Sequence, residues 1–427
     1  MLDRTISPEV FDFKALNLPD ITSKTLNNGI NLNIINRGDE DVCKIVLVWN
    51  GGKFDVENAT APEIMTKMFF SGTEKLSADE ITETFDFYGS RINVSCDAHF
   101  TTMSITALNR TLPEILPVMT QILNCSTFPE NEFENQLKKY VANKSIEAQT
   151  VQYQSKKLCK KLLFGENHPA FKSIQNIDEI KELKREEVVQ CYNSIILKTK
   201  PEIFIAGKIT EEVLSYITDT FSNYVFSDNP IKQTLIPVPY NIGAKTECIS
   251  LPEQVQSSMD ILIPTIDAHN PDYISLKIAI IALGGYFGSR LNKVIREEKG
   301  LTYGIHSHIY SSLEGCAISI NSQFDGKTAD EVTAETISQI RIMKDEPISH
   351  EEIASARKFY MSILANTSEN LFASLDYYIS CYKNSLPNSF FSTTIDVLEN
   401  ITPAEIRHMA EKYFDLSNIK IAIAGNV

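Results

Sequence analysis

Apolar residues recur along this chain with two alternating periods, which predict short strands and longer helices. Apolar runs of strand length lie at residues 30–35 and 43–48, and a helical pattern follows at residues 61–70. Pro62 suits the first turn of that helix, and Gly72 lies just beyond its end. The second half of the chain repeats this order. Strand pairs that are adjacent in sequence and followed by runs of helices predict an α+β fold with antiparallel sheets.

The end of the chain repeats a segment from its middle. Residues 177–207 read IDEIKELKREEVVQCYNSIILKTKPEIFIAG, and residues 395–425 read IDVLENITPAEIRHMAEKYFDLSNIKIAIAG. At a constant offset of 218 positions, the apolar helix positions and a strand ending in Ala-Gly coincide without a gap. We therefore expect two similar halves.

The join between the halves is predicted at residues 226–246. Three prolines and a glycine in this segment bar a regular helix and favour an extended linker. The expected division is an N-terminal domain at residues 1–225, the linker, and a C-terminal domain at residues 247–427.

Local signals add detail to this plan. Residues 303–310 and 316–321 read as two strands of a hairpin. Capping boxes, in which a Ser or Thr begins a helix and a Glu three residues later closes the cap, are predicted at Ser77/Glu80, Thr328/Glu331, Ser349/Glu352 and Thr402/Glu405.

Composition and charge narrow the class of protein. The 427 residues are 43% hydrophobic and 22% charged, as in globular proteins, and the net charge is -15. That charge argues against nucleic acid or an anionic membrane as the main partner. Residues 1–20 show no secretory signal, and the eight cysteines include no Cys-x-x-Cys pair. We expect free thiols in a reducing cytoplasm.

Residues 61–81, APEIMTKMFFSGTEKLSADEI, resemble the active-site helix of the pitrilysin/insulinase family of metallopeptidases. The motif of that family is His-x-x-Glu-His. Its two histidines share one helix face and bind zinc, and the Glu between them activates water. Residues 68–75, MFFSGTEK, match the part that follows the motif.

The motif itself is absent. Glu63, Thr66 and Lys67 occupy its positions, and the third ligand, a Glu in the family, falls near Asn143. A Glu/Thr/Lys/Asn set is no familiar transition-metal site, so the resemblance implies no catalytic zinc in this chain. From the residues alone, Glu63 and Lys67 are expected to form an i,i+4 surface ion pair.

Residues 284–305, GGYFGSRLNKVIREEKGLTYGI, resemble the substrate-side motif of the same family. The resemblance assigns its Arg and Tyr to Arg296 and Tyr303. Arg296 falls in the last turn of a predicted helix that Gly300 terminates, which puts Tyr303 near the helix end. A guanidinium and a phenol that converge can hold a peptide carbonyl and the oxyanion formed from it. The alternative is an ion pair of Arg296 with a neighbouring Glu and a half-buried Tyr303.

The resemblance further implies that this is the zinc-less chain of a two-chain peptidase for unfolded peptides. A related partner carrying His-x-x-Glu-His would supply the zinc, its bound water and the general base. Asn93 matches a family edge strand along which substrate lies extended, and such pairing tolerates many sequences.

Two rival interpretations stay open. One is a binding or scaffold protein that kept the fold and lost catalysis, and the other is a weakly active homodimer, which the missing ligands disfavour. His306 and His308 share a strand face, and we expect them to be solvated near a hairpin tip rather than bound to metal.

Overall fold

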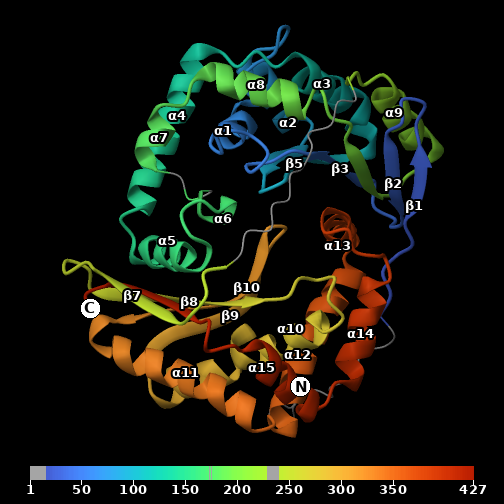
Figure 1. Cartoon of the computed structure of the whole chain (residues 1–427). Coiled ribbons are helices and arrows are strands. Elements are labelled where there is room, and N and C mark those ends of the chain that lie inside the picture. Colours follow the sequence, from blue (N-terminus) through green and yellow to red (C-terminus); the bar gives the residue numbers. More distant parts are fainter. Residues whose placement is uncertain (1–15, 173, 175, 228–239) are drawn as a thin grey trace, which may run out of the picture.

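The computed structural model describes residues 16–172, 174, 176–227 and 240–427. Within this part of the chain the strands form two sheets, one from each half of the sequence (Figure 1). Most neighbouring strands are antiparallel, and helices pack on both sheets, so the predicted α+β class is confirmed. Each sheet also contains one parallel pair, β2 with β6 and β7 with β11.

The first sheet has the order β1-β2-β6-β3-β5-β4. Its strands are β1 (Thr22–Thr25), β2 (Asn31–Asn36), β3 (Val42–Asn50), β4 (Arg91–Cys96), β5 (Phe100–Leu108) and β6 (Glu202–Gly207). The helices of this half are α1 (Ala61–Met68), α2 (Ala78–Phe87), η1 (Asn109–Thr111), α3 (Leu112–Cys125), α4 (Glu130–Glu147), α5 (Val151–Phe164), α6 (Pro169–Lys172), α7 (Ile177–Lys181), α8 (Arg185–Ile195) and α9 (Glu211–Ser222).

The second sheet has the order β7-β11-β8-β10-β9. Its strands are β7 (Lys245–Ser250), β8 (Gln256–Thr265), β9 (Thr302–Ser312), β10 (Gly315–Asp325) and β11 (Lys420–Gly425). The helices are α10 (Tyr273–Ile280), the π-helical turns η2 (Ile281–Gly285) and η3 (Asn292–Glu298), η4 (Gly326–Thr328), α11 (Ala329–Asp345), α12 (His350–Glu369), α13 (Leu371–Lys383), α14 (Phe390–Asn400) and α15 (Pro403–Tyr413).

The repeat seen in the sequence is a repeat of structure. The bounds of α8 and α15 differ by the predicted offset of 218 positions, and so do those of β6 and β11. The strands β9 and β10 form the predicted hairpin, with Leu313 and Glu314 as its loop. Within the predicted linker, residues 228–239 lie outside the described part, so the domain limits stay a prediction.

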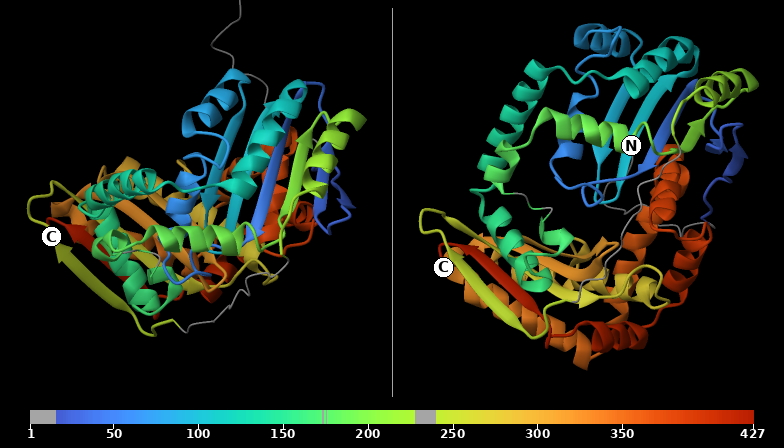
Figure 2. Two further views of the ribbon diagram at one scale, coloured as in Figure 1. Left: turned by 90° about the horizontal axis from the view of Figure 1, so that it is seen from above. Right: turned by 45° about the horizontal axis from the view of Figure 1, so that its top comes forward.

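One helix from each half packs on the sheet of the other half. Helix α5 lies on β8 and β11 of the second sheet, while α13 lies on β6 of the first (Figures 1 and 2). Leu162 and Leu163 of α5 pack with Leu262 and Ala422. Leu375 and Tyr378 of α13 pack, in the same way, with Val46 and Phe204. The two halves are therefore interlocked through reciprocal helices.

This exchange explains why the central strands are apolar along their whole length. In β6, Ile203 and Ile205 face the core of the first half, whereas Phe204 and Ala206 face α13. A strand that is covered on both faces reads as a continuous apolar run rather than an alternating one.

The predicted caps are confirmed at three of the four helices. The reciprocal Ser/Thr–Glu hydrogen bonds are present at Ser77, Ser349 and Thr402. The prediction at Thr328 is wrong, because its hydroxyl donates to the carbonyl of Asp325 (2.8 Å) and does not cap α11. Asp325 instead begins the preceding turn, η4.

Candidate functional site

Helix α1 begins as its sequence dictates, with Pro62 in the first turn, and it carries Glu63 toward α4. The Glu63 carboxylate accepts a hydrogen bond from the hydroxyl of Tyr140 (2.5 Å) and forms an ion pair with Lys53. The ammonium groups of Lys67 and Lys144 lie 5.9 Å and 5.7 Å from the centre of the Tyr140 ring. We call Lys53, Glu63, Lys67, Tyr140 and Lys144 the α1 cluster.

Neighbouring groups keep the Glu63 carboxylate ionised and engaged in hydrogen bonds. Burial raises its pKa, but the charge and hydrogen bond of Lys53 and the hydrogen bond from Tyr140 outweigh burial, so the net pKa lies below the ordinary value. Burial and the nearby Glu63 charge raise the pKa of Tyr140. A carboxylate neutralised by an ammonium is a poor general base for activating water.

The remaining positions of the family motif also lack metal-binding chemistry. The Thr66 hydroxyl donates to the backbone carbonyl of Glu63 (2.9 Å), and Asn143 is exposed on α4. In the described part of the chain, no three His, Cys, Asp or Glu side chains converge as metal ligands would. The donor set therefore does not fit a zinc ion, because the ammonium of Lys67 stands at one histidine position and the carboxylate at the other, Glu63, is already paired with Lys53.

The predicted ion pair of Glu63 with Lys67 is wrong. Glu63 pairs with Lys53 from the loop after β3, and Lys67 lies near the ring of Tyr140. The i,i+4 spacing permits such a pair on an isolated helix. Lys53 neutralises the half-buried carboxylate and the Tyr140 hydroxyl hydrogen-bonds it, so both of its needs are met. Neither partner could have been identified from local spacing in the sequence.

The second predicted site lies at the end of η3 and the start of β9. Gly300 adopts a left-handed conformation (φ 66°) just after η3, as expected of a helix terminator. The Arg296 guanidinium lies 3.7 Å from the centre of the Phe287 ring, and one nitrogen is 3.6 Å from the Glu297 carboxylate. The alternative is thus confirmed for the ion pair of Arg296 with a neighbouring Glu, but its half-buried tyrosine is wrong, because Tyr303 is 92% exposed.

Tyr303 lines a cavity between α5 and the second sheet, which we call the α5 cavity. Its volume is about 520 Å³, and its wall comes from α5, β8, β9 and β10. The polar wall residues with ionisable groups include Lys156, Lys160, Asp260, Tyr303, His306 and His308. Arg296 is not among the described residues of this wall, so the structure does not bring Arg296 and Tyr303 together at one cavity.

His306 and His308 are placed differently from the prediction. They lie within β9 on the cavity wall rather than near the hairpin tip, and both are exposed, as expected. Burial, Lys156 and His306 lower the pKa of His308. No carboxylate is among the groups that set the pKa of His308.

The α5 cavity contains a lysine and an aspartate with perturbed protonation. Burial and the nearby Lys156 lower the pKa of Lys160 to about 8. Burial raises the pKa of Asp260 to about 6, although a hydrogen bond from Ser155 (2.6 Å) opposes this. No local pattern in the sequence indicates that Lys160 and Asp260 meet, because the two residues are 100 positions apart.

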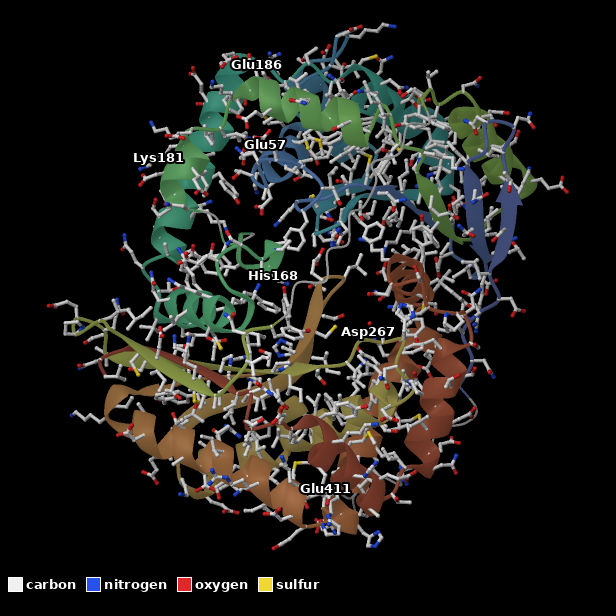
Figure 3. The ribbon with its side chains drawn as sticks, in the orientation of Figure 1. Glu57, His168, Lys181, Glu186, Asp267 and Glu411 are labelled. Atoms are coloured by element: carbon white, nitrogen blue, oxygen red, sulfur yellow. The ribbon has the colours of Figure 1, made fainter. Side chains whose placement is uncertain are left out.

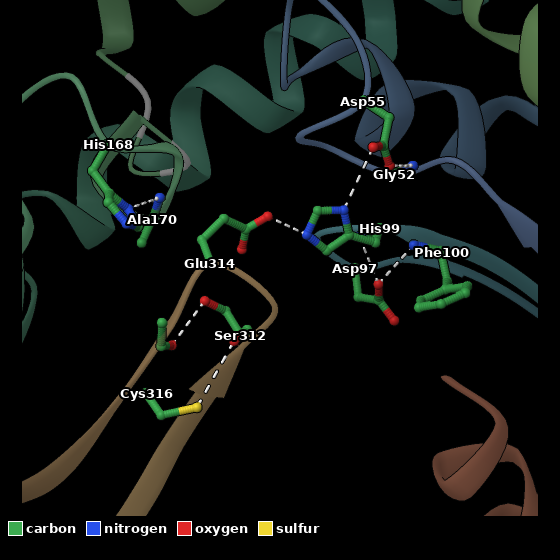
Figure 4. A network of polar contacts seen from close by, with 11 residues as sticks. Gly52, Asp55, Asp97, His99, Phe100, His168, Ala170, Ser312, Glu314 and Cys316 are labelled. Atoms are coloured by element: carbon green, nitrogen blue, oxygen red, sulfur yellow. Dashed lines mark hydrogen bonds and ion pairs between the residues drawn. The ribbon is translucent and has the colours of Figure 1, made fainter. Parts of the chain in front are cut away.

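A third polar group joins the two halves. The tip of the β9–β10 hairpin places Glu314 against the ring of His99, whose other nitrogen lies 3.5 Å from Asp55 (Figure 4). His99 and Glu314 are 4% and 7% exposed. Burial lowers the pKa of His99, but the hydrogen bonds and charges of Asp55 and Glu314 outweigh it and raise the pKa to about 9.

His168 lies on the segment after α5, on the other side of Glu314 (Figures 3 and 4). It is fully buried, and its Nδ1 accepts a hydrogen bond from the backbone of Ala170 (3.0 Å). Burial lowers its pKa. The contacts of His99 with Asp55 and Glu314 carry no local sequence signal, because these partners lie 44 and 215 positions away in the chain.

Asn93 lies on β4, which forms the outer edge of the first sheet, as the resemblance implied. The side chain of Asn93 is exposed, and its residue pairs with Ser104 of β5 on the inner side. The opposite edge of β4 has no partner strand in the described chain. The geometry thus leaves room for an added strand, and the role of Asn93 stays a prediction.

Comparison with known families gives two matches. The family described as "Insulinase (Peptidase family M16)" matches residues 39–168, and the one described as "Peptidase M16 inactive domain" matches residues 182–360. Together they span most of the chain. No helix in the described residues has the length and apolar character needed to cross a membrane.

Two similar sequences carry contrasting names. An uncharacterized zinc protease, YmxG, from Bacillus subtilis is 22% identical over 68% of this chain and 70% of its own length. A "non-peptidase homolog" YmxG from Helicobacter pylori is 19% identical over 88% and 87%.

Solved structures show the same fold. A peptidase M16 inactive domain from Pseudomonas fluorescens has a TM-score of 0.83 at 17% identity and covers 96% of this chain and 98% of its own. A protease from Helicobacter pylori has a TM-score of 0.87 at 14% identity, covering 96% and 100%.

Proposed function

Because the chain belongs to the M16 (insulinase) family of peptidases, we propose that it is the non-catalytic, peptide-binding subunit of a two-chain zinc metallopeptidase. The observation that carries this proposal is the α1 cluster. An ammonium–carboxylate–phenol group occupies the helix face that zinc requires, so this half offers neither a metal site nor a general base.

The fold that surrounds the lost site supports a role in holding peptide. The first sheet ends in the edge strand β4, whose outer side has no partner strand in the described chain, and Tyr303 projects from β9 of the second sheet with 92% of its surface exposed. A peptide can pair with such an edge through its backbone, whatever its side chains are. Unfolded peptides are therefore the substrate class that we propose.

In the proposed complex, a related partner chain with His-x-x-Glu-His supplies zinc, its bound water and the general base. The phenol of Tyr303 and the guanidinium of Arg296 orient the scissile peptide and donate hydrogen bonds to its developing oxyanion. Arg296 must leave the Phe287 ring to do so, because that contact now holds it away from the α5 cavity.

The test is peptide hydrolysis by the chain mixed with such a partner, compared with each chain alone. We expect turnover only from the mixture. Tyr303→Phe and Arg296→Ala should each lower turnover about 100-fold or more while the complex still forms, as loss of an oxyanion donor does elsewhere. Unchanged turnover in both variants would refute the assigned roles.

The position of Arg296 also favours a second candidate, a binding or scaffold protein without any catalytic role. Stacking on Phe287 and facing Glu297 is a purely structural arrangement. Under this alternative the chain binds peptides, but no partner makes them substrates. We also propose a cytoplasmic location, on the ground that all eight cysteines are free thiols.

A further inference from the structure

Two lysines on one face of α5 point into the α5 cavity. Lys156 and Lys160 are separated by one helical turn, and both line its wall. Among the residues that the structure describes, neither has a carboxylate within ion-pair distance. The neighbouring Lys161, on another face of α5, does pair with Glu166 (2.6 Å). Lys160 is half-buried and Lys156 is exposed beside it. A half-buried cation without a counter-ion, next to a second cation, favours the binding of an anion.

Asp260, the acidic residue of the cavity wall, does not form an ion pair with Lys156 or Lys160. Asp260 of β8 accepts a hydrogen bond from the Ser155 hydroxyl (2.6 Å), which also lies 3.0 Å from the hydroxyl of Ser258. Lys160 lies instead over the ring of Tyr310, 4.7 Å from its centre. The cavity thus holds two ammonium groups beside one carboxylate that is already hydrogen-bonded.

The cavity lies against the second sheet, where the edge strand β9 forms part of its wall. Among the described residues, β10 is the only strand that pairs with β9, and the side chain of Asn292 also hydrogen-bonds the backbone N–H (3.2 Å) and C=O (2.8 Å) of Ile305. His306, His308 and Tyr310 follow one another at alternate positions and line the cavity. A peptide that extends along β9 beyond Ile305 would direct every second side chain toward the same face.

We propose that the α5 cavity binds a carboxylate of a peptide, either an acidic side chain or a free C-terminus, through Lys156 and Lys160. This inference rests on the proposed function of peptide binding and adds a preference to it. The wall also contains His306 and His308, which can donate hydrogen bonds to the same carboxylate. The chain therefore prefers peptides that present a carboxylate to this cavity.

The test measures binding of fluorescent peptides to the full chain. Three peptides share one sequence: the first has a central Glu and an amidated C-terminus, the second has Gln in place of Glu, and the third has Gln and a free C-terminal carboxylate. We expect the Glu peptide, the free-acid peptide or both to bind about tenfold more tightly than the neutral one, as charge-assisted hydrogen bonds allow. The peptide that binds more tightly than the neutral one identifies the source of the carboxylate, either the Glu side chain or the C-terminus.

Matched double variants locate the effect. The Lys156→Gln/Lys160→Gln variant should lose the tenfold preference, and Lys156→Arg/Lys160→Arg should keep most of it. The control Lys157→Gln/Lys161→Gln removes the same charge from the other faces of α5 and should retain the preference.

Equal binding of all three peptides, or a preference that survives Lys156→Gln/Lys160→Gln, overturns this inference but leaves the proposed function intact. Failure of every peptide to bind overturns both.

Discussion

At the scale of single residues, the α1 cluster shows how helix α1 is held in place by side chains that do not bind a metal. A carboxylate on a half-buried helix face needs a partner, and in this chain Lys53 and Tyr140 provide it. The sequence showed that the metal ligands were missing. It could not show the replacement, because Lys53 and Tyr140 lie ten and 77 positions from Glu63 and spacing carries no signal at that range.

Lys53→Met should destabilise the protein by about 1–3 kcal/mol, because it leaves the Glu63 carboxylate without its ion pair in a half-buried site. Urea unfolding measures the change. Lys181→Met is the matched control, since its pair with Asp178 is exposed and should contribute less than about 0.5 kcal/mol. Equal effects of the two substitutions would contradict the structural role given to the α1 cluster.

His99 should make stability fall as pH rises. Its folded pKa of about 9 lies above the ordinary value of 6.5, so the stabilisation is complete below pH 6.5 and is lost as pH rises through about 9. The buried contact contributes on the order of 3 kcal/mol by this linkage.

The comparison of wild type with His99→Gln in urea unfolding at pH 6 to pH 9.5 isolates this contribution. The difference between the two proteins should shrink steadily over that range. A difference that is constant with pH would show that His99 is neutral in the folded state.

At the scale of elements, the apolar pattern predicted which segments are helices and strands but not what each helix covers. The offset of 218 positions correctly related α8 to α15 and β6 to β11. It could not show that α5 and α13 exchange sheets, because an amphipathic pattern defines a buried face and not its partner. The continuous apolar runs of β6 and β11 do carry a signal of two-sided burial.

Because α13 of the second half packs on the first sheet, a substitution in α13 should lower the stability of the first half. Leu375 of α13 is fully buried against the first sheet, so Leu375→Ala should cost about 2–5 kcal/mol. Hydrogen exchange should then rise in β3 and β6. Ile363→Ala on α12 is the control, because Ile363 is 44% exposed. Exchange that rises only within the second half would argue against the interlock.

Helix caps allow a direct comparison of a confirmed and a wrong prediction. Ser349 caps α12, and Ser349→Ala should cost about 1 kcal/mol in thermal or urea unfolding. Thr328 does not cap α11, so Thr328→Ala should cost less than about 0.5 kcal/mol. The reverse order of effects would show that the cap lies at Thr328 after all.

At the scale of the whole molecule, two similar halves are joined by exchanged helices and by the buried contact of His99 with Glu314. The sequence predicted the α+β class, the repeat and the family. The α5 cavity and the His99 contact arise only when the halves come together, so neither could be found along the chain. The position of Arg296 against Phe287 depends likewise on side-chain packing that a motif does not specify.

The central claim is that this chain binds no catalytic zinc and that the metal resides on another chain. The most direct measurement is the zinc content of the purified full-length protein after equilibration with zinc and removal of the excess. The α1 cluster predicts far less than one zinc per chain, and no peptide hydrolysis by the chain alone. One tightly held zinc per chain, accompanied by hydrolysis without a partner, would contradict the account.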